Sequence, residues 1–236
     1  MERLRAGAAK LGLAMTPEQF AQFQTYFEEM VAWNQKVNLT AVTDYDEVQE
    51  RHFLDSLSVV WALGQRGWDL SNPFKAIDVG AGPGLPGLAI KIACPATQLT
   101  LLDSIAKKTS FLCHLVCRLG LEGVEVLTGR AEEVARRDGY RESYDLALAR
   151  GVAALPTLIE ICLPFVKVGG ALVAHKGAQV WSEVSQAGRA LDLLGGKLRA
   201  VHDQEAEGRA LVIIDKIAPS PLIYPRRAGV PQRRPL

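Results

Sequence analysis

From residue 74 onward, short apolar runs alternate with longer stretches that have the apolar spacing of a helix. The runs start at Phe74, Gln98, Val124, Tyr144 and Gly170. Strands that alternate with helices pair in parallel through right-handed crossovers. The alternation therefore predicts an α/β fold with a doubly wound, mostly parallel sheet, whose ligands lie at the carboxyl ends of the strands.

Both ends of this pattern carry further elements. Residues 198–201 and 211–217 predict two strands joined by a short polar link, so we expect an antiparallel terminal hairpin and a total of seven strands. Residues 1–70 predict a helical extension packed on the core, and residues 71–218 predict the sheet domain. Residues 219–236 form a tail rich in proline and arginine, which we expect to adopt neither helix nor strand because proline lacks the N–H that both need.

The N-terminal extension has two predicted helices. Its first fifteen residues predict only a frayed helix or a basic arm, and Thr16 then predicts a capped helix start. A second helix is expected from Asp44 to about Leu63. On its polar side, opposite the apolar face, the spacing places four residues: Arg51, His52, Asp55 and Ser56. A solvated face with an Arg51–Asp55 ion pair and a functional cluster are both open readings.

The first strand leads into a glycine-rich turn that follows Asp78 and contains Gly80, Gly82, Gly84 and Gly87. Glycine takes up positive φ and lets the backbone approach a ligand closely. The helix expected to begin near Leu85 would direct its free N–H groups at an anion. We therefore predict a turn that cradles a ligand.

The spacing of these glycines distinguishes two kinds of cofactor. In the dinucleotide frame G-x-G-x-x-G counted from Gly80, the sixth residue is Leu85, which is too large for close helix packing. A match from Gly82 starts two residues late, so an NAD-dependent oxidoreductase stays an alternative. From Asp78 the run has the form D-x-G-x-G-x-G, which resembles the first motif of class I S-adenosylmethionine-dependent methyltransferases.

Two later strand ends supply further candidates for the cofactor site. Asp103 ends the second strand, where a carboxylate can accept hydrogen bonds from both ribose hydroxyls of an adenosine, in either cofactor. After the third strand, backbone groups of Ala131 and Glu132 are placed to read adenine, with a helix-capping acid pair as the alternative.

The segment after the fourth strand, Ala149 to Val152, narrows the chemistry. Methyltransferases acting on exocyclic amines usually carry Asn or Asp, two prolines and an aromatic residue here, and cytosine-C5 enzymes need a cysteine nucleophile. Neither pattern is present. A ring nitrogen with a free lone pair, such as guanine N7, needs neither device, since positioning and electrostatics suffice.

Charge and cysteine content limit the partners and the compartment. The net charge is +1, so nucleic-acid binding must come from local clusters. The best such cluster is in the tail: Arg226, Arg227, Arg233 and Arg234. A solubilising tail is the alternative. The four cysteines form no C-x-x-C pair and no signal peptide is recognisable, so we expect a reducing cytoplasm, no metal and no membrane partner. Nothing demands a dimer, and we expect a monomer.

Motifs along nearly the whole chain resemble the bacterial RsmG family, also called GidB or glucose-inhibited division protein B. The matching motifs are Asn38-Leu39-Thr40, Arg51-His52-Phe53-Leu54-Asp55-Ser56, Asp78-Val79-Gly80, Gly82-Pro83-Gly84-Leu85-Pro86-Gly87, Leu102-Asp103-Ser104, Arg150 and Ala174-His175-Lys176-Gly177. The resemblance implies S-adenosylmethionine as cofactor and methylation of guanine N7 in the 530 loop of 16S ribosomal RNA. It makes 16S rRNA or the small ribosomal subunit the expected partner and residues 71–218 a Rossmann-like methyltransferase domain.

The same resemblance implies two sets of site residues. The cofactor set is Gly80, Gly82, Leu85, Asp103, Ser104, Ile105, Ala131, Glu132 and Arg150. The substrate-positioning set is Asn38, Arg51, His52, Asp55 and Lys176. Within it we expect Arg51 and Lys176 to contact phosphate, and Asn38 or Asp55 to bond the guanine edge. Two alternatives to the rRNA enzyme remain: a methyltransferase acting on another RNA, and a non-catalytic RNA-binding factor.

Overall fold

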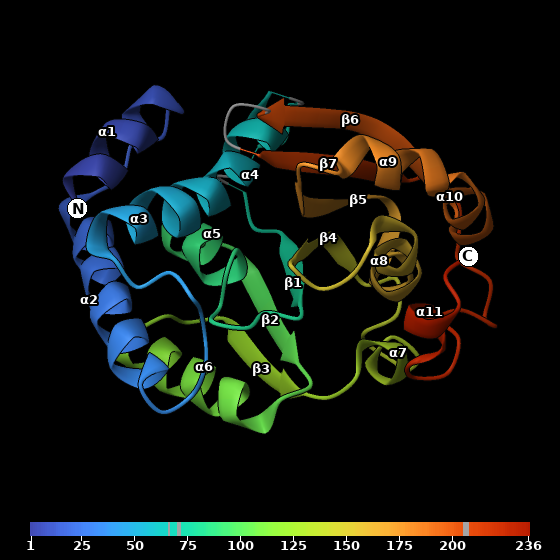
Figure 1. Ribbon diagram of the computed structural model, residues 1–236, viewed down its shortest axis with the longest axis horizontal. Helices are drawn as coiled ribbons and strands as arrows, with labels where there is room; N and C mark the ends of the chain where they lie inside the picture. The colour runs from blue at the N-terminus through green and yellow to red at the C-terminus, as the bar shows by residue number, and fades with distance from the viewer. Residues whose placement is uncertain (66, 70–71, 205–207) are drawn as a thin grey trace. The chain divides into compact units, whose positions relative to one another are not determined.

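The computed structural model describes residues 1–65, 67–69, 72–204 and 208–236. Its seven strands form one sheet in the order β3-β2-β1-β4-β5-β7-β6 (Figure 1). They are β1 (Lys75–Val79), β2 (Gln98–Asp103), β3 (Val124–Thr128), β4 (Tyr144–Arg150), β5 (Val166–Gly177), β6 (Gly196–Gln204) and β7 (Arg209–Lys216). β4 pairs in parallel with β1 and β5, and β2 with β3, whereas β7 pairs antiparallel with β5 and β6. The predicted doubly wound, mostly parallel sheet with an antiparallel terminal hairpin is confirmed.

The chain divides into two compact units. The first comprises Met1–Pro73 and Ala81–Thr128, and the second comprises Phe74–Gly80 and Gly129–Leu236. The predicted boundary between residues 70 and 71 lies outside the described residues, and the division into extension, sheet domain and tail stays a prediction. No helix in the described ranges combines the length and apolarity needed to cross a bilayer.

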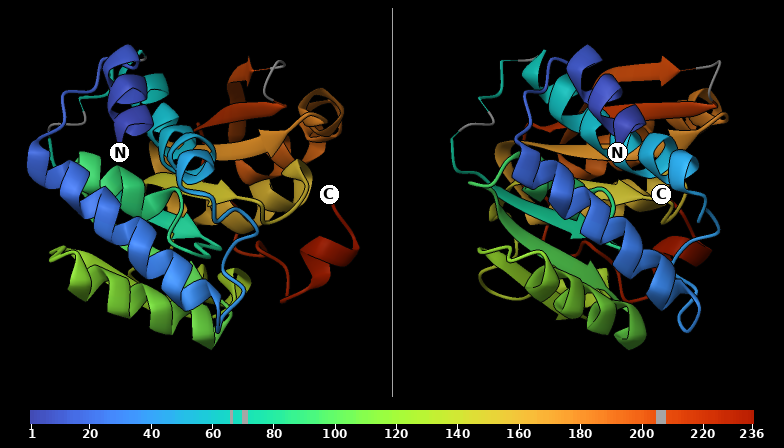
Figure 2. Two further views of the ribbon diagram at one scale, coloured as in Figure 1. Left: turned by 60° about the vertical axis from the view of Figure 1, so that its left-hand side comes forward. Right: turned by 90° about the vertical axis from the view of Figure 1, so that its left-hand side faces the viewer.

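Helices make up most of the first unit. They are α1 (Glu2–Lys10), α2 (Pro17–Asn34), α3 (Tyr45–Val48), the π-helical turn η1 (Gln49–Leu54), α4 (Asp55–Gly64), α5 (Gly87–Ala93) and α6 (Ala106–Arg118). The capping box at the start of α2 is confirmed, since Thr16 and Gln19 bond each other's backbone N–H through their side chains. From there α2 runs beside α5 and α6 (Figure 2), and its buried stripe includes Phe23 and Met30.

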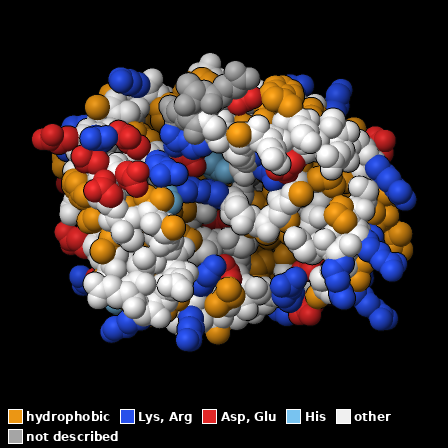
Figure 3. Space-filling view, viewed as in Figure 1, with side chains coloured by type: hydrophobic (Ala, Val, Ile, Leu, Met, Phe, Trp, Pro, Cys, Tyr) orange, Lys and Arg blue, Asp and Glu red, His pale blue; other side chains and the backbone are white. Residues whose placement is uncertain are grey.

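The first ten residues are more ordered than the sequence predicts. They form the helix α1, in which Leu4 is fully buried. Arg3 makes ion pairs with Asp46 at 3.0 Å and with Glu50 at 2.7 Å, and acidic and basic side chains are mixed over this region in Figure 3. The expectation of a frayed helix or basic arm is therefore wrong, because the alanines and leucine between the basic residues pack against η1.

The second predicted helix is interrupted by the π-helical turn η1. A π turn closes with i→i+5 bonds, so it shifts the helical phase that the sequence spacing assumes. His52 is only 6% exposed and Ser56 is fully buried, so the reading of a solvated face does not hold for these two residues. Arg51 does face outward, with its guanidinium 3.5 Å from the Glu47 carboxylate. The polar cluster is thus split between a buried and an exposed side.

The second unit holds the rest of the sheet and the tail. Its helical elements are α7 (Ala131–Val134), α8 (Leu155–Cys162), the 3-10 turn η2 (Leu163–Phe165), α9 (Val180–Gln186), α10 (Gly188–Leu194) and α11 (Val230–Arg233). The helices α9 and α10 are separated only by Ala187. The prediction of a tail without helix is wrong, because α11 forms with Pro231 in its first turn, where the missing N–H costs nothing. In Figure 1, α11 lies beside α8, to which it packs.

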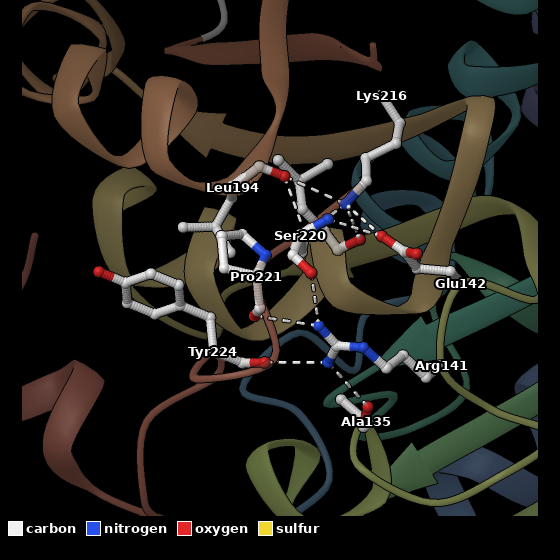
Figure 4. Close-up of polar contacts among 9 residues, drawn as sticks. Ala135, Arg141, Glu142, Leu194, Lys216, Ser220, Pro221 and Tyr224 are labelled. Atoms are coloured by element: carbon white, nitrogen blue, oxygen red, sulfur yellow. Dashed lines mark hydrogen bonds and ion pairs between the residues drawn. The ribbon is translucent and has the colours of Figure 1, made fainter. Parts of the chain in front are cut away.

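Basic side chains of the sheet domain hold the start of the tail in place (Figure 4). The guanidinium of Arg141 donates to the carbonyl oxygens of Ser220 at 2.8 Å and Tyr224 at 2.9 Å. The fully buried ammonium of Lys216 donates to the carbonyls of Leu163 and Leu194 and contacts the Ser220 hydroxyl. Carbonyl groups of an irregular segment are satisfied in this way without a sheet partner.

The buried ammonium of Lys216 predicts a pH dependence of stability. Burial lowers its pKa to about 8, although the Glu142 carboxylate at 3.2 Å opposes the shift. An unfolded lysine has a pKa of about 10.4, so between these values the unfolded chain holds a proton that the folded chain has released. The Lys216 contribution to the free energy of unfolding therefore rises with pH through this window.

We expect the free energy of unfolding of the natural chain, minus that of Lys216→Met, to be more positive at about pH 9.5 than at about pH 7.5. Urea unfolding of both proteins at the two pH values measures this, and the other titrating groups cancel in the difference. Equal differences at the two pH values would contradict the assignment.

Candidate functional site

The glycine turn adopts a conformation that side chains would block. Gly80, Gly82 and Gly84 all have positive φ, at 75°, 56° and 93°. A Cβ atom on Gly80 would lie 2.6 Å from the side chain of Val152, and one on Gly84 would lie 2.6 Å from Leu88. Glycine is therefore required here by both conformation and space. The helix α5 begins only at Gly87, so the predicted start near Leu85 is two residues early.

In the first unit, Asp103 organises the turn. One carboxylate oxygen accepts the N–H of Gly82 at 2.9 Å, and the other accepts the N–H of Ile105 at 2.9 Å. Each oxygen keeps a lone pair for another donor, such as a ribose hydroxyl. Ser104 is exposed and Ile105 is 48% exposed, which leaves an apolar surface beside the carboxylate. The structure thus brings Gly82, Asp103 and Ile105 together, and this donor set fits an adenosine.

The helix α2 supports the same turn, which the sequence did not reveal. The hydroxyl of Tyr26 donates to the carbonyl oxygen of Pro83 at 2.7 Å, and its ring packs on Phe53 with centroids 5.2 Å apart. The sequence shows nothing that distinguishes Tyr26 from the other aromatic residues of α2. Its role emerges only from the packing of α2 on the turn.

Replacing Tyr26 with Phe is expected to lower the free energy of unfolding by about 0.5–1.5 kcal/mol, because the Pro83 carbonyl loses its donor while the ring packing is kept. Chemical denaturation of the two proteins measures the loss. Unchanged stability would show that water replaces the hydroxyl.

The polar residues of the N-terminal extension form a hydrogen-bonded turn. The side-chain oxygen of Asn34 accepts the N–H groups of Leu39 and Thr40, and the Thr40 hydroxyl lies 2.7 Å from Nε2 of His52. Asn38, between these anchored positions, is exposed. The first unit therefore links the predicted residue His52 to the turn that carries Asn38. Asn34 and Thr40 were missed as the groups that hold this turn, although Asn at a helix end is a known turn acceptor.

Asp55 and Arg51 differ in how far they are exposed. Asp55 is half-buried at the start of α4, where its carbonyl oxygen accepts the hydroxyl of Ser58. Arg51 is exposed and lies beside Glu47 on the preceding turn of the chain.

In the second unit, the side chain of Glu132 is engaged with the tail. Its carboxylate accepts the N–H of Gly229 at 2.8 Å and lies 3.2 Å from Arg130, and the residue is only 5% exposed. Burial would raise its pKa, but the Gly229 N–H and Arg130 outweigh this and the pKa is lowered. Only the backbone of Glu132 and of half-exposed Ala131 is left for a ligand.

Lys176 and Arg150 lie at the carboxyl ends of neighbouring strands, where Arg150 pairs in register with His175. The ammonium of Lys176 has a side-chain exposure of 7%, lies 2.5 Å from the Glu183 carboxylate and donates to the carbonyl of Ala153 at 2.8 Å. Its protein partners leave it little capacity for the phosphate contact expected of it. It holds the segment that follows β4 through Ala153, and its expected phosphate contact stays a prediction.

The four tail arginines fall into two groups, one bonded to a buried carboxylate and three exposed. Arg226 forms two side-chain hydrogen bonds to the fully buried carboxylate of Glu160, and its pKa is raised by them. This engagement argues against phosphate as its main partner. Arg227, Arg233 and Arg234 are exposed.

The sequence of this chain is similar to those of known proteins. The model of one protein family, rRNA small subunit methyltransferase G, matches residues 19–212. Ribosomal RNA small subunit methyltransferase G of Moorella thermoacetica is 45% identical over all of this chain and 98% of its own length. The protein of the same name from Dehalococcoides mccartyi is 43% identical over the full length of both. The chain belongs to the methyltransferase G family. It is accordingly a methyltransferase that acts on small-subunit ribosomal RNA.

Solved structures of low sequence identity share the fold of this chain. A mutant of MtNAS in complex with S-adenosylmethionine has a TM-score of 0.57 at 15% identity, covering 85% of this chain and 76% of that one. A SAM-dependent methyltransferase from Aquifex aeolicus has a TM-score of 0.55 at 17% identity, covering 74% and 94%. Family membership together with this fold confirms the predicted cofactor, S-adenosylmethionine.

Of the four cysteine thiols of this methyltransferase G family member, two are poor nucleophiles and the other two lie on α6. Burial raises the pKa of Cys94 to about 11, and the pKa of the fully buried Cys162 is raised further. Cys113 and Cys117 are exposed on α6, in the first unit. None of the four lies in the segment after β4, where a covalent mechanism would need one.

Proposed function

We propose that this chain methylates guanine N7 in the 530 loop of 16S ribosomal RNA. The carboxyl end of β4 carries the proposal: Ala149 and Arg150 end the strand and Gly151 and Val152 follow it, with no amide–proline–aromatic motif and no thiol. N7 already has a free lone pair, so an enzyme need not remove a proton or add to the ring before transfer. When bound, S-adenosylmethionine supplies an electrophilic methyl group.

The residues of the chain then bind and orient. We assign the cofactor to Gly80, Gly82, Leu85, Asp103, Ser104, Ile105, Ala131, Glu132 and Arg150. The carboxylate of Asp103 supports this assignment, because its remaining lone pairs suit ribose hydroxyls while two backbone donors fix its orientation. Glu132 contributes through its backbone, since its side chain is held by Gly229.

The substrate side is assigned to Asn38, Arg51, His52 and Asp55. The exposed guanidinium of Arg51 suits a phosphate, and the turn of Asn38 is held by Asn34 and, through Thr40, by His52. For Lys176, also assigned to the substrate side, the phosphate contact stays a prediction. Lys176 positions the segment after β4 through Ala153, and so orders the region on which the base would lie. N7 is inaccessible in the deep groove of an RNA helix, so the target guanine must be presented unpaired.

Transfer of labelled methyl from S-adenosylmethionine to small ribosomal subunits that lack the modification tests the proposal. We expect label in N7-methylguanosine after nuclease digestion and mass spectrometry, at one position in the 530 loop. Label at an exocyclic nitrogen, on a pyrimidine, or in another region of the RNA would contradict it.

A further inference from the structure

A pocket lies in the first unit, between the C-terminal part of α2 and the helix α6. Its volume is about 550 Å³, which lies within the range of small-molecule binding sites. It is lined by Glu29, Ala32, Trp33, Lys36, Val37, Lys107, Ser110 and His114. None of these residues belongs to the cofactor or substrate sets assigned above. The pocket is therefore a separate feature of the same unit.

One wall of the pocket is a fixed aromatic surface. The ring of half-buried Trp33 packs on the fully buried Phe111, with centroids 5.5 Å apart, and on the imidazole of His114, with centroids 5.1 Å apart and planes tilted by 37°. Contacts on the inner side hold the indole in one orientation and leave its remaining surface toward the pocket. Such a surface binds a nucleobase by stacking, whatever the base, because every base has a π-face.

The charges around the pocket are complementary to a phosphate. Lys36 follows α2 and Lys107 lies on the first turn of α6, and both are exposed. Within the described ranges neither ammonium has an ion-pair partner. The one acid in the pocket is Glu29, whose carboxylate is bonded by His114 and by Arg118, each at 2.7 Å. Its negative charge is thereby compensated, and two unpaired cations remain.

We propose that this pocket binds an unpaired nucleotide of the ribosomal RNA substrate, other than the guanine that is methylated. Its base stacks on Trp33 and its phosphates contact Lys36 and Lys107. An aromatic wall beside two unpaired ammonium groups favours a nucleotide over a purely apolar ligand, which would leave both cations unused. The inference rests on the proposed function, because it takes the RNA substrate of this enzyme as the source of the nucleotide.

Electrostatic contacts to RNA are measured by their salt dependence. Binding of the natural chain and of the double variant Lys36→Gln/Lys107→Gln to a fluorescent RNA fragment that contains the 530 loop is followed by anisotropy at several salt concentrations. We expect the slope of log K against log salt to fall by roughly one for each lysine removed. Lys108→Gln is the matched control: it is the next residue on α6 and does not line the pocket, so its slope should equal that of the natural chain.

Stacking is tested with Trp33→Ala and Trp33→Phe. The alanine variant should bind the fragment about 5- to 150-fold more weakly, whereas phenylalanine keeps a ring for the base and should restore most of the affinity. The dissociation constant for S-adenosylmethionine, measured by calorimetry, should stay that of the natural chain in each variant. Since Trp33 packs on Phe111, thermal unfolding is used to check that each variant is folded. If Trp33→Ala is unfolded, the lysine variants alone test the pocket.

Two failures are distinguishable. If the natural chain transfers methyl to the small subunit but the lysine double variant keeps the same RNA affinity, salt slope and KM for the subunit, the nucleotide pocket is overturned and the proposed function stands. If the natural chain transfers no methyl to guanine N7, the proposed function fails, and the anisotropy series still decides whether the pocket binds RNA.

Discussion

Replacing Arg226 with Met is expected to lower the free energy of unfolding by about 3–5 kcal/mol, because it leaves a buried carboxylate without its cation. The carboxylate of Glu160 is fully buried in α8, and the Arg226 guanidinium donates to both of its oxygens, at 2.8 and 2.5 Å. The same guanidinium also donates to the carbonyl of Arg234 at 2.7 Å. Loss of this one side chain therefore releases the tail at two places.

Two further variants separate the charge effect from simple loss of packing. Arg227→Met makes the same replacement at the next, exposed residue and should leave stability unchanged. Glu160→Gln/Arg226→Met should recover most of the loss, because glutamine is neutral yet keeps an oxygen for the backbone N–H of residue 226. Urea unfolding of the set measures the differences. A double variant as unstable as Arg226→Met would show that the buried charge is not the cause.

Replacing Asp103 with Asn is expected to weaken S-adenosylmethionine binding by about 1.5–3 kcal/mol or more, which is at least a tenfold rise in the dissociation constant. The carboxylate accepts the N–H groups of Gly82 and Ile105, one on each oxygen. Asparagine has one oxygen and one NH₂ group, so its oxygen can accept only one of these two N–H groups. Its NH₂ group then faces the other N–H, and two donors oppose each other. The turn loses its fixed shape in addition to the charge that would bind the ribose hydroxyls.

Calorimetric titration with S-adenosylmethionine measures this effect, and thermal unfolding shows how much of it is loss of structure. Asp138→Asn removes an exposed acid from the loop after α7 and should bind the cofactor as the natural chain does. Unchanged affinity in Asp103→Asn would remove the carboxylate from the cofactor site.

The order of strands and helices was predictable because it depends on local patterns. Each apolar run became a strand that starts within two residues of the expected position, except that β5 starts earlier, at Val166. The short link before residue 211 indicated the antiparallel hairpin. These features follow from alternation and connection length alone, which a single sequence displays.

Other features depend on contacts between distant residues, and here the sequence failed. His52 and Ser56 are buried, although one reading of the helical spacing made them part of a solvated face. The proline-rich tail was expected to form neither helix nor strand, yet α11 forms there, and Glu160 and Glu132 accept hydrogen bonds from the tail. Nothing in the local spacing of these acids reveals a partner that lies more than sixty residues away. The same holds for Lys176, whose acceptors are set by the path of the chain after β4.

The attachment of residues 226–231 to Glu132, Glu160 and Thr157 has a consequence for biosynthesis. These partners leave the ribosome before the segment that completes them, so a growing chain exposes or buries its acids without their counterpart until translation of this region ends. Co-translational folding of the second unit must therefore stop short of its final state. Emergence of residues 226–231, and not emergence of the sheet, is the step that completes it.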